Sequence, residues 1–175
     1  MNKTKKISLA AMMLSMIIVL LWLERMLPPL PFLPPNVKLG LSNVVIMYAL
    51  LFIGKREATI LVVLKALFNT LLRGPLGGLL SLCGGLLSLL CMLLLLYLFR
   101  ERISYIALSI VAAIMHNIGQ LIAISLLFRS FLLFSAYLPF LLIASIIFGI
   151  GTGVLLKTVL PILGRLAINV DTKKE

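Results

Sequence analysis

Long apolar runs separated by short polar or proline-rich breaks make up most of the sequence. The runs predicted to form helices cover residues 7–27, 39–53, 58–72, 79–99, 103–128 and 137–163. A helix of about 20 apolar residues is long enough to cross the hydrocarbon core of a bilayer. The pattern therefore predicts an all-α fold, with residues 1–175 forming a single integral membrane domain of about six transmembrane helices.

The breaks between these runs refine the prediction. The first run follows three lysines, as in a signal peptide, but it ends in Glu24-Arg25 with no small-residue cleavage site, so we expect it to stay as the first span. Five prolines within residues 28–35 then exclude a helix and predict a loop at the membrane face. The second and third runs are short for a full crossing and also fit a re-entrant pair.

Composition excludes a water-soluble domain. Hydrophobic residues make up 62% of the 175 residues and charged residues only 12%, and the mean hydropathy is +1.22, far from the balance of soluble domains. The net charge of +11 comes from 16 basic and five acidic residues. Because the basic residues form short clusters between apolar runs and no basic stripe, they fit anionic lipid headgroups better than nucleic acid.

The distribution of these basic residues predicts the orientation of the chain. If the N-terminus is cytoplasmic, ten lysines and arginines fall inside and four outside, as the positive-inside rule requires. Both termini are then cytoplasmic. The inside set is Lys3, Lys5, Lys6, Lys55, Arg56, Arg100, Arg102, Arg165, Lys173 and Lys174, and the outside set is Arg25, Lys38, Arg73 and Arg129.

Polar side chains within the spans are candidates for a binding site, because an ionisable group in a membrane costs several kcal/mol. Four-residue spacing places Lys65, Asn69 and Arg73 on one helix face, and His116 with Gln120 on another. The predicted orientation gathers them in the outer half of the bundle, beneath the proline-rich loop. The predicted substrate-binding residues are Lys38, Asn43, Lys65, Asn69, Arg73, His116, Asn117 and Gln120.

Basic and amide groups in such a pocket favour an anionic or carbonyl-rich ligand. Structural roles remain open for each residue. Lys65 fits a pairing with Glu24 or a side chain that extends to the interface. The polar residues of segment 116–120 fit hydrogen bonds between helices, and Arg73 fits an interfacial anchor. Only their common location favours a site.

Several motifs carry a family resemblance over about residues 6–156. They are segment 36–43 (NVKLGLSN), Arg73-Gly74, Ser81 with Gly84-Gly85, segment 116–120 (HNIGQ) and Tyr137-Leu138-Pro139. Together they resemble the bacterial membrane proteins called heptaprenyl diphosphate synthase component I, or Gx transporter family. This family is similar to the substrate-binding (S) subunits of energy-coupling factor transporters, which capture vitamins and have six helices and a first loop that covers an outward pocket.

The resemblance implies a substrate-binding subunit in the bacterial cytoplasmic membrane, in contact with membrane lipids. Its ligand would be vitamin-like, for example a flavin or a quinone precursor. Its partners would be a transmembrane coupling subunit and ATPases, and small residues on the first helix would dock the coupling subunit. In this sequence those residues are Ser8, Ala11 and Ser15.

The sequence does not support an enzyme. Prenyl chain elongation needs clusters of aspartates that hold magnesium against a diphosphate, whereas Asp171 is the only aspartate in the chain. We therefore predict no catalytic residues, no metal site and no cofactor. The alternative hypothesis is a non-catalytic membrane subunit, associated either with heptaprenyl diphosphate and menaquinone biosynthesis or with flavin-based extracellular electron transfer.

Overall fold

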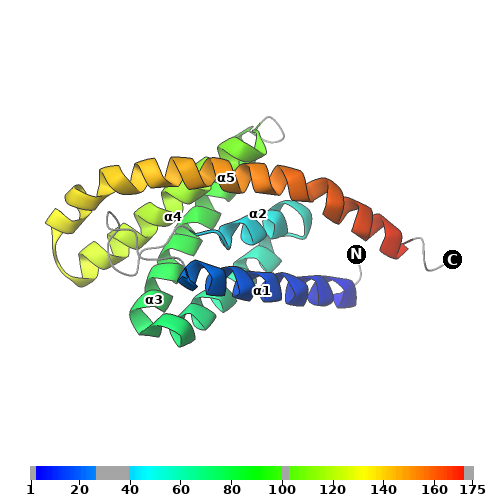
Figure 1. Ribbon diagram of the computed structural model, residues 1–175, viewed down its shortest axis with the longest axis horizontal. Coiled ribbons are helices and arrows are strands. Elements are labelled where there is room, and N and C mark those ends of the chain that lie inside the picture. Colours follow the sequence, from blue (N-terminus) through cyan, green and yellow to red (C-terminus); the bar gives the residue numbers. More distant parts are fainter. Residues whose placement is uncertain (1–2, 27–39, 100–102, 172–175) are drawn as a thin grey trace.

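Helices form all the regular structure of the described residues, which are 3–26, 40–99 and 103–171 of a computed structural model. The helices are α1 (Lys3–Met26), α2 (Asn43–Phe52), α3 (Lys55–Phe99), α4 (Tyr105–Leu127) and α5 (Phe131–Asp171). Figure 1 shows that α5 extends along most of the length of the molecule. The start of α1 and the end of α5 lie at the same end of the molecule in this view (Figure 1).

A sharp bend divides α3 near its middle (Figure 1). Gly74 has φ 80° and ψ 177° there, a backbone conformation that is essentially restricted to glycine. The sequence predicted a break over residues 73–78, between the third and fourth spans. The structure narrows this break to Gly74, because Pro75 is well suited to the first turn of the helix that follows.

Two other helix boundaries differ from the predicted spans. α2 begins at Asn43, after a turn in which the Asn43 amide donates to the Gly40 carbonyl at 2.9 Å, and not at residue 39. α5 begins at Phe131, six residues before the predicted start at Tyr137, and continues through Pro139. A proline removes one backbone hydrogen bond, which neighbouring groups can replace in membrane helices.

Within the described residues, four helical segments are long and apolar enough to cross a membrane: Ile7–Met26, Lys55–Phe99, Tyr105–Leu127 and Phe134–Thr158. The surface is apolar as well, since Leu71 is 82% exposed and Tyr97 and Phe131 are 80% exposed. Water does not accommodate such a continuous apolar surface, whereas lipid does. The chain is thus an all-α, multi-pass membrane protein, as the sequence predicted.

The larger of two core clusters draws most of its residues from α1, α2 and α3, and a smaller one joins α3, α4 and α5. On α1, Met13, Ile17 and Leu21 are buried at helical spacing. On α2, which has only ten residues, six are buried, so this short helix lies inside the bundle. The end of α1 and the start of α2 are both packed inside the bundle, so polar residues at these two ends lie near α3 and α4.

Close contacts between backbones join α3, α4 and α5. A Cβ added at Gly119 of α4 would lie 2.9 Å from the Cys83 carbonyl oxygen of α3. A Cβ added at Gly149 of α5 would lie 2.6 Å from the Cα of Ile110 on α4. These glycines permit the close helix packing that is common in membrane proteins.

Candidate functional site

Three helices and the turn before α2 contribute to a small cavity with a polar lining. Its volume is about 10 Å³, enough for about one water molecule. The lining is formed by Leu21, Glu24, Gly40, Lys65, Asn69, Gly77, Leu80, Ser81, His116 and Gln120. The cavity thus collects polar groups from α1, from the turn before α2, from both halves of α3 and from α4.

Helical spacing brings most of the predicted residues to this cavity. Lys65 and Asn69 lie one turn apart on the first half of α3, and His116 and Gln120 lie one turn apart on α4. All four side chains are buried, with 2% to 6% of their surface exposed. The sequence-based grouping of these four residues agrees with their placement.

Gly40 allows the turn before α2 to approach the imidazole of His116. Its φ of 75° is readily adopted by glycine. A Cβ at this position would lie 3.0 Å from the Cδ2 of His116 and 2.6 Å from the Nδ2 of Asn43. A larger residue here would therefore collide with two predicted site residues.

Two charged side chains of opposite sign are held in the cavity by specific hydrogen bonds. The Lys65 ammonium donates to the Asn43 Oδ1 at 2.6 Å. The Leu41 amide donates to the Glu24 Oε1 at 2.8 Å. Glu24 is only 6% exposed, and its charge interacts with that of Lys65. These hydrogen bonds and the opposite signs of the two charges offset part of the cost of burying them.

The bend of α3 forms one wall of the cavity. The Asn69 Nδ2 donates to the Gly77 carbonyl at 2.9 Å and so links the helix before Gly74 to the helix after it. Among the described residues, the buried Asn69 Oδ1, Ser81 Oγ and Asn43 Nδ2 have no hydrogen-bond partner. Buried polar atoms in native proteins usually have one, so these atoms are suited to a bound water or ligand.

Three of the predicted residues that the structure describes, Asn43, Asn117 and Arg73, do not line this cavity, although Asn43 accepts the hydrogen bond of Lys65. Asn117 is buried, but its Nδ2 donates to the Ser145 Oγ of α5 at 2.8 Å. Arg73 is partly buried beside the α3 bend, where its Cβ faces Gly77. Lys38 and the proline-rich segment 28–35 lie outside the described residues.

Glu24, Gly40 and Ser81 belong to the cavity but were not among the predicted site residues. A signal for Glu24 was present in the sequence. It continues the spacing of the buried residues Met13, Ile17 and Leu21 and therefore shares their helix face. Gly40 and Ser81 have no comparable signal, because their place in the cavity depends on how the helices pack.

Comparison with known proteins gives the family. The sequence profile described as heptaprenyl diphosphate synthase component I matches residues 13–159. The chain belongs to this family. No curated protein matches the chain significantly.

A solved structure shares the fold of this member of the component I family. It is described as the S component of a bacterial ECF transporter, and it is 24% identical to this chain with a TM-score of 0.58. The similarity covers 97% of this chain and 98% of that one. The resemblance predicted from the sequence is thereby confirmed at the level of family and fold.

The family description refers to a synthase, but the described part of this chain has no group of three or more His, Cys, Asp or Glu side chains able to hold a metal ion. Glu24 is the only acidic residue in the lining of the polar cavity. A diphosphate held by magnesium requires several carboxylates. The geometry of this component I protein therefore provides hydrogen bonds and charge but no metal-binding cluster in the residues described.

The outer face of α1 carries the residues predicted to dock a partner. Ser8, Ala11 and Ser15 are exposed, and the Ser15 Oγ donates to the Ala11 carbonyl at 3.1 Å. This bond satisfies the hydroxyl within its own helix. The face opposite Met13 and Ile17 therefore presents small groups among exposed apolar residues such as Met12 and Val19.

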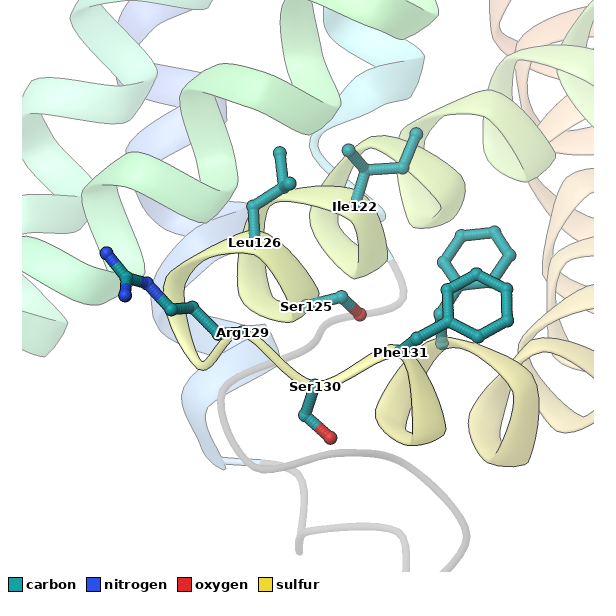
Figure 2. Close-up of a pocket in the computed structure, with 7 residues that line it drawn as sticks. Ile122, Ser125, Leu126, Arg129, Ser130 and Phe131 are labelled. Atoms are coloured by element: carbon teal, nitrogen blue, oxygen red, sulfur yellow. The ribbon is translucent and has the colours of Figure 1, made fainter.

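A larger pocket of about 440 Å³ lies at the corner between α4 and α5 (Figure 2). Figure 2 shows the Arg129 side chain extending away from Phe131, with the Ser125 hydroxyl between the two. Arg129 has φ 49°, which lets the chain turn sharply into α5. The lining is mostly apolar and is formed by Ile122, Ser125, Leu126, Arg129, Ser130, Phe131 and Phe134.

Proposed function

We propose that this component I protein is the membrane-embedded substrate-binding subunit of an energy-coupling-factor-like importer. The observation that carries the proposal is the buried polar cavity, in which Glu24, Lys65, Asn69, His116 and Gln120 converge within an otherwise apolar bundle. Burying this many polar groups is unfavourable in a membrane unless they serve binding or packing. The S-component fold supports the same conclusion.

In this proposal the chain crosses the bacterial cytoplasmic membrane six times as a single domain. The two halves of α3 form separate crossings, and the short α2 completes the count. Both termini are cytoplasmic, so the cavity lies in the outer half of the bundle. Arg73 and Lys38 contact the ligand from the outer rim, and Asn117 supports the site.

The ligand is a small vitamin-like molecule, anionic or carbonyl-rich, and flavins and quinone precursors are candidate classes. The cavity of about 10 Å³ is far smaller than the several hundred Å³ of typical ligand pockets. Binding therefore requires the helices around it to separate. α1 is suited to move because it contacts only α2 and α3 among the described helices.

The partners follow from the same proposal. The chain captures the ligand and docks through the α1 face of Ser8, Ala11 and Ser15 on a transmembrane coupling subunit, which in turn binds ATPases. The chain itself carries out no chemical reaction. The energy for import comes from the partner subunits.

Ligand capture in cells tests this proposal. Lys65→Ala combined with His116→Ala removes two groups of the cavity and should abolish ligand-dependent growth or uptake at equal membrane abundance. Lys157→Ala is the matched control, since Lys157 is exposed on α5. If the double variant and the control behaved alike, the proposal would be wrong.

The family description supports one alternative, a non-catalytic membrane subunit associated with heptaprenyl diphosphate or menaquinone biosynthesis. A related form of it is a subunit of flavin-based extracellular electron transfer. Affinity purification separates these functions. The importer proposal predicts co-purification with ATPase subunits, whereas the alternative predicts a soluble, Asp-rich synthase or a redox protein.

A further inference from the structure

The polar cavity contains one acid and one base, and this pair restricts the charge of its ligand. Among the described residues, Glu24 and Lys65 are the only carboxylate and the only ammonium in the lining. Their exposed fractions are 6% and 2%, so water screens neither of them well. With the imidazole of His116 counted as neutral, the charges of the lining residues that the structure describes sum to zero.

Both charged groups retain hydrogen-bonding capacity. An ammonium has three N–H donors, and Lys65 uses one of them on Asn43. A carboxylate can accept about four hydrogen bonds, and Glu24 accepts one from the Leu41 amide. The cavity therefore offers a strong donor and a strong acceptor at the same time.

The neighbouring amide and hydroxyl side chains also offer both hydrogen-bond donors and acceptors. Among the residues described, the Asn69 Oδ1 is a buried acceptor without a partner, and the Ser81 Oγ is a buried hydroxyl without one. The side chains of both residues are more than nine-tenths buried and line the cavity. A ligand that brought only acceptors would leave the Asn69 Oδ1 unsatisfied, which is unfavourable in a buried site.

An anion does not fit this arrangement. A ligand carboxylate or phosphate bound to Lys65 would lie in the same small cavity as the Glu24 carboxylate. Two negative charges in one small cavity repel strongly in a medium of low dielectric constant. Arg73 also interacts with the charge of Glu24. However, Arg73 does not line the cavity and is only partly buried, so at the outer rim its charge is screened more strongly than the charges of Glu24 and Lys65.

We propose that the ligand of this cavity has no net charge and presents a hydrogen-bond acceptor to Lys65 together with an N–H or O–H donor to Glu24. A heterocyclic amide or imide edge has this pattern, and so does a zwitterion. The inference rests on the proposed function and narrows its ligand class. The acceptor is a carbonyl or carboxylate oxygen, and the donor satisfies Glu24 and Asn69.

The test is to identify the small molecule that accompanies the full-length protein when it is extracted from its own membrane. The molecule is released by denaturation and analysed by liquid chromatography and mass spectrometry in both polarities. The variants are Glu24→Gln and the matched control Glu57→Gln, which makes the same chemical change in the first turn of α3. Glutamine keeps an oxygen that can accept from the Leu41 amide, so the local fold is retained.

The proposal predicts that the wild type and Glu57→Gln carry a molecule of zero net charge at pH 7. Glu24→Gln should reduce its occupancy by about tenfold or more, the effect expected for one hydrogen bond to a charged group. An anionic molecule on the wild type would overturn the inference while leaving the proposed function intact. Absence of any small molecule from the wild type would instead contradict the proposed function, and the inference with it. If Glu24→Gln does not fold, the charge of the wild-type ligand decides alone.

Discussion

The buried pair of Lys65 and Glu24 is the most demanding feature at the scale of single residues. Each charge has one hydrogen-bond partner in the described structure, and each lies within the field of the other. Removal of one charge leaves the other uncompensated in a medium where charges are costly. The two residues should therefore be coupled in stability as well as in binding.

We predict that Lys65→Met lowers the free energy of unfolding by about 3 kcal/mol, because it leaves the buried charge of Glu24 without an opposite charge in the cavity. Methionine keeps most of the length of the side chain, so the loss reports charge more than volume. When Glu24→Gln is added to Lys65→Met, the double variant should regain more than half of the lost free energy of unfolding. The measurement is unfolding in detergent, with Lys157→Met as the control. If the losses in free energy of unfolding of the two single variants simply added in the double variant, the two charges would not be coupled.

Single residues also show what the sequence could predict about the site. Lys65 with Asn69, and His116 with Gln120, follow from the period of one helix and need no knowledge of packing. Asn117 was grouped with them, but it follows His116 directly and is therefore rotated by about 100° around the helix axis. Its amide reaches Ser145 of α5, a neighbour that depends on tertiary packing and that no local pattern indicates.

At the scale of helices, close approach is set by glycines at the crossings. A Cβ at Gly119 would meet the Cys83 carbonyl oxygen and the Gly84 Cα, both at 2.9 Å. Both are backbone atoms, so no rotamer change can relieve the contact. Gly119 therefore lets α4 approach α3 closely. This approach holds His116 and Gln120 against the second half of α3, which carries Ser81.

Gly119→Ala should destabilise the protein by about 1–3 kcal/mol, as overpacking of a close-packed interface does. It should also weaken ligand capture, because separating α3 from α4 opens one wall of the cavity. The control is Gly151→Ala on α5, where an added Cβ meets nothing within 4 Å. Melting temperatures in detergent compare the two variants, and equal values would refute this role of Gly119.

The helices themselves were largely predictable from hydropathy, and their boundaries less so. The first and fifth runs, 7–27 and 103–128, nearly coincide with the apolar parts of α1 and α4. The break in α3 was predicted as six residues and is one residue, Gly74, since Pro75 can begin a helix. The start of α5 was predicted at Tyr137, six residues late, and the helix continues through Pro139, which a membrane helix tolerates.

At the scale of the whole molecule, the proposed orientation places the start of α3 inside and the α4–α5 corner outside. The described structure puts Lys55 at the first residue of α3 and Arg129 at the corner. These two positions lie in polar breaks between apolar helices and carry basic residues, so either can reach a membrane surface. The proposed orientation places Lys55 inside and Arg129 outside, and the reverse orientation would exchange the two sides.

Labelling of single cysteines tests this orientation. Cys83 and Cys91 are first replaced by serine, and a cysteine is then introduced at Ser130 or at Lys55. A membrane-impermeant maleimide should label Ser130→Cys in intact cells, and Lys55→Cys only after permeabilisation. The reverse pattern would place the polar cavity in the inner half of the bundle and contradict capture from outside.

The most direct test of the central claim is native mass spectrometry of the protein extracted from its own membrane, which reads bound ligand and partner subunits together. The importer proposal predicts that the chain carries one small molecule of vitamin-like size and associates with a transmembrane coupling subunit and ATPases. It also predicts that Lys65→Ala with His116→Ala loses the small molecule. A chain that carries no small molecule and associates with a soluble synthase would contradict the account.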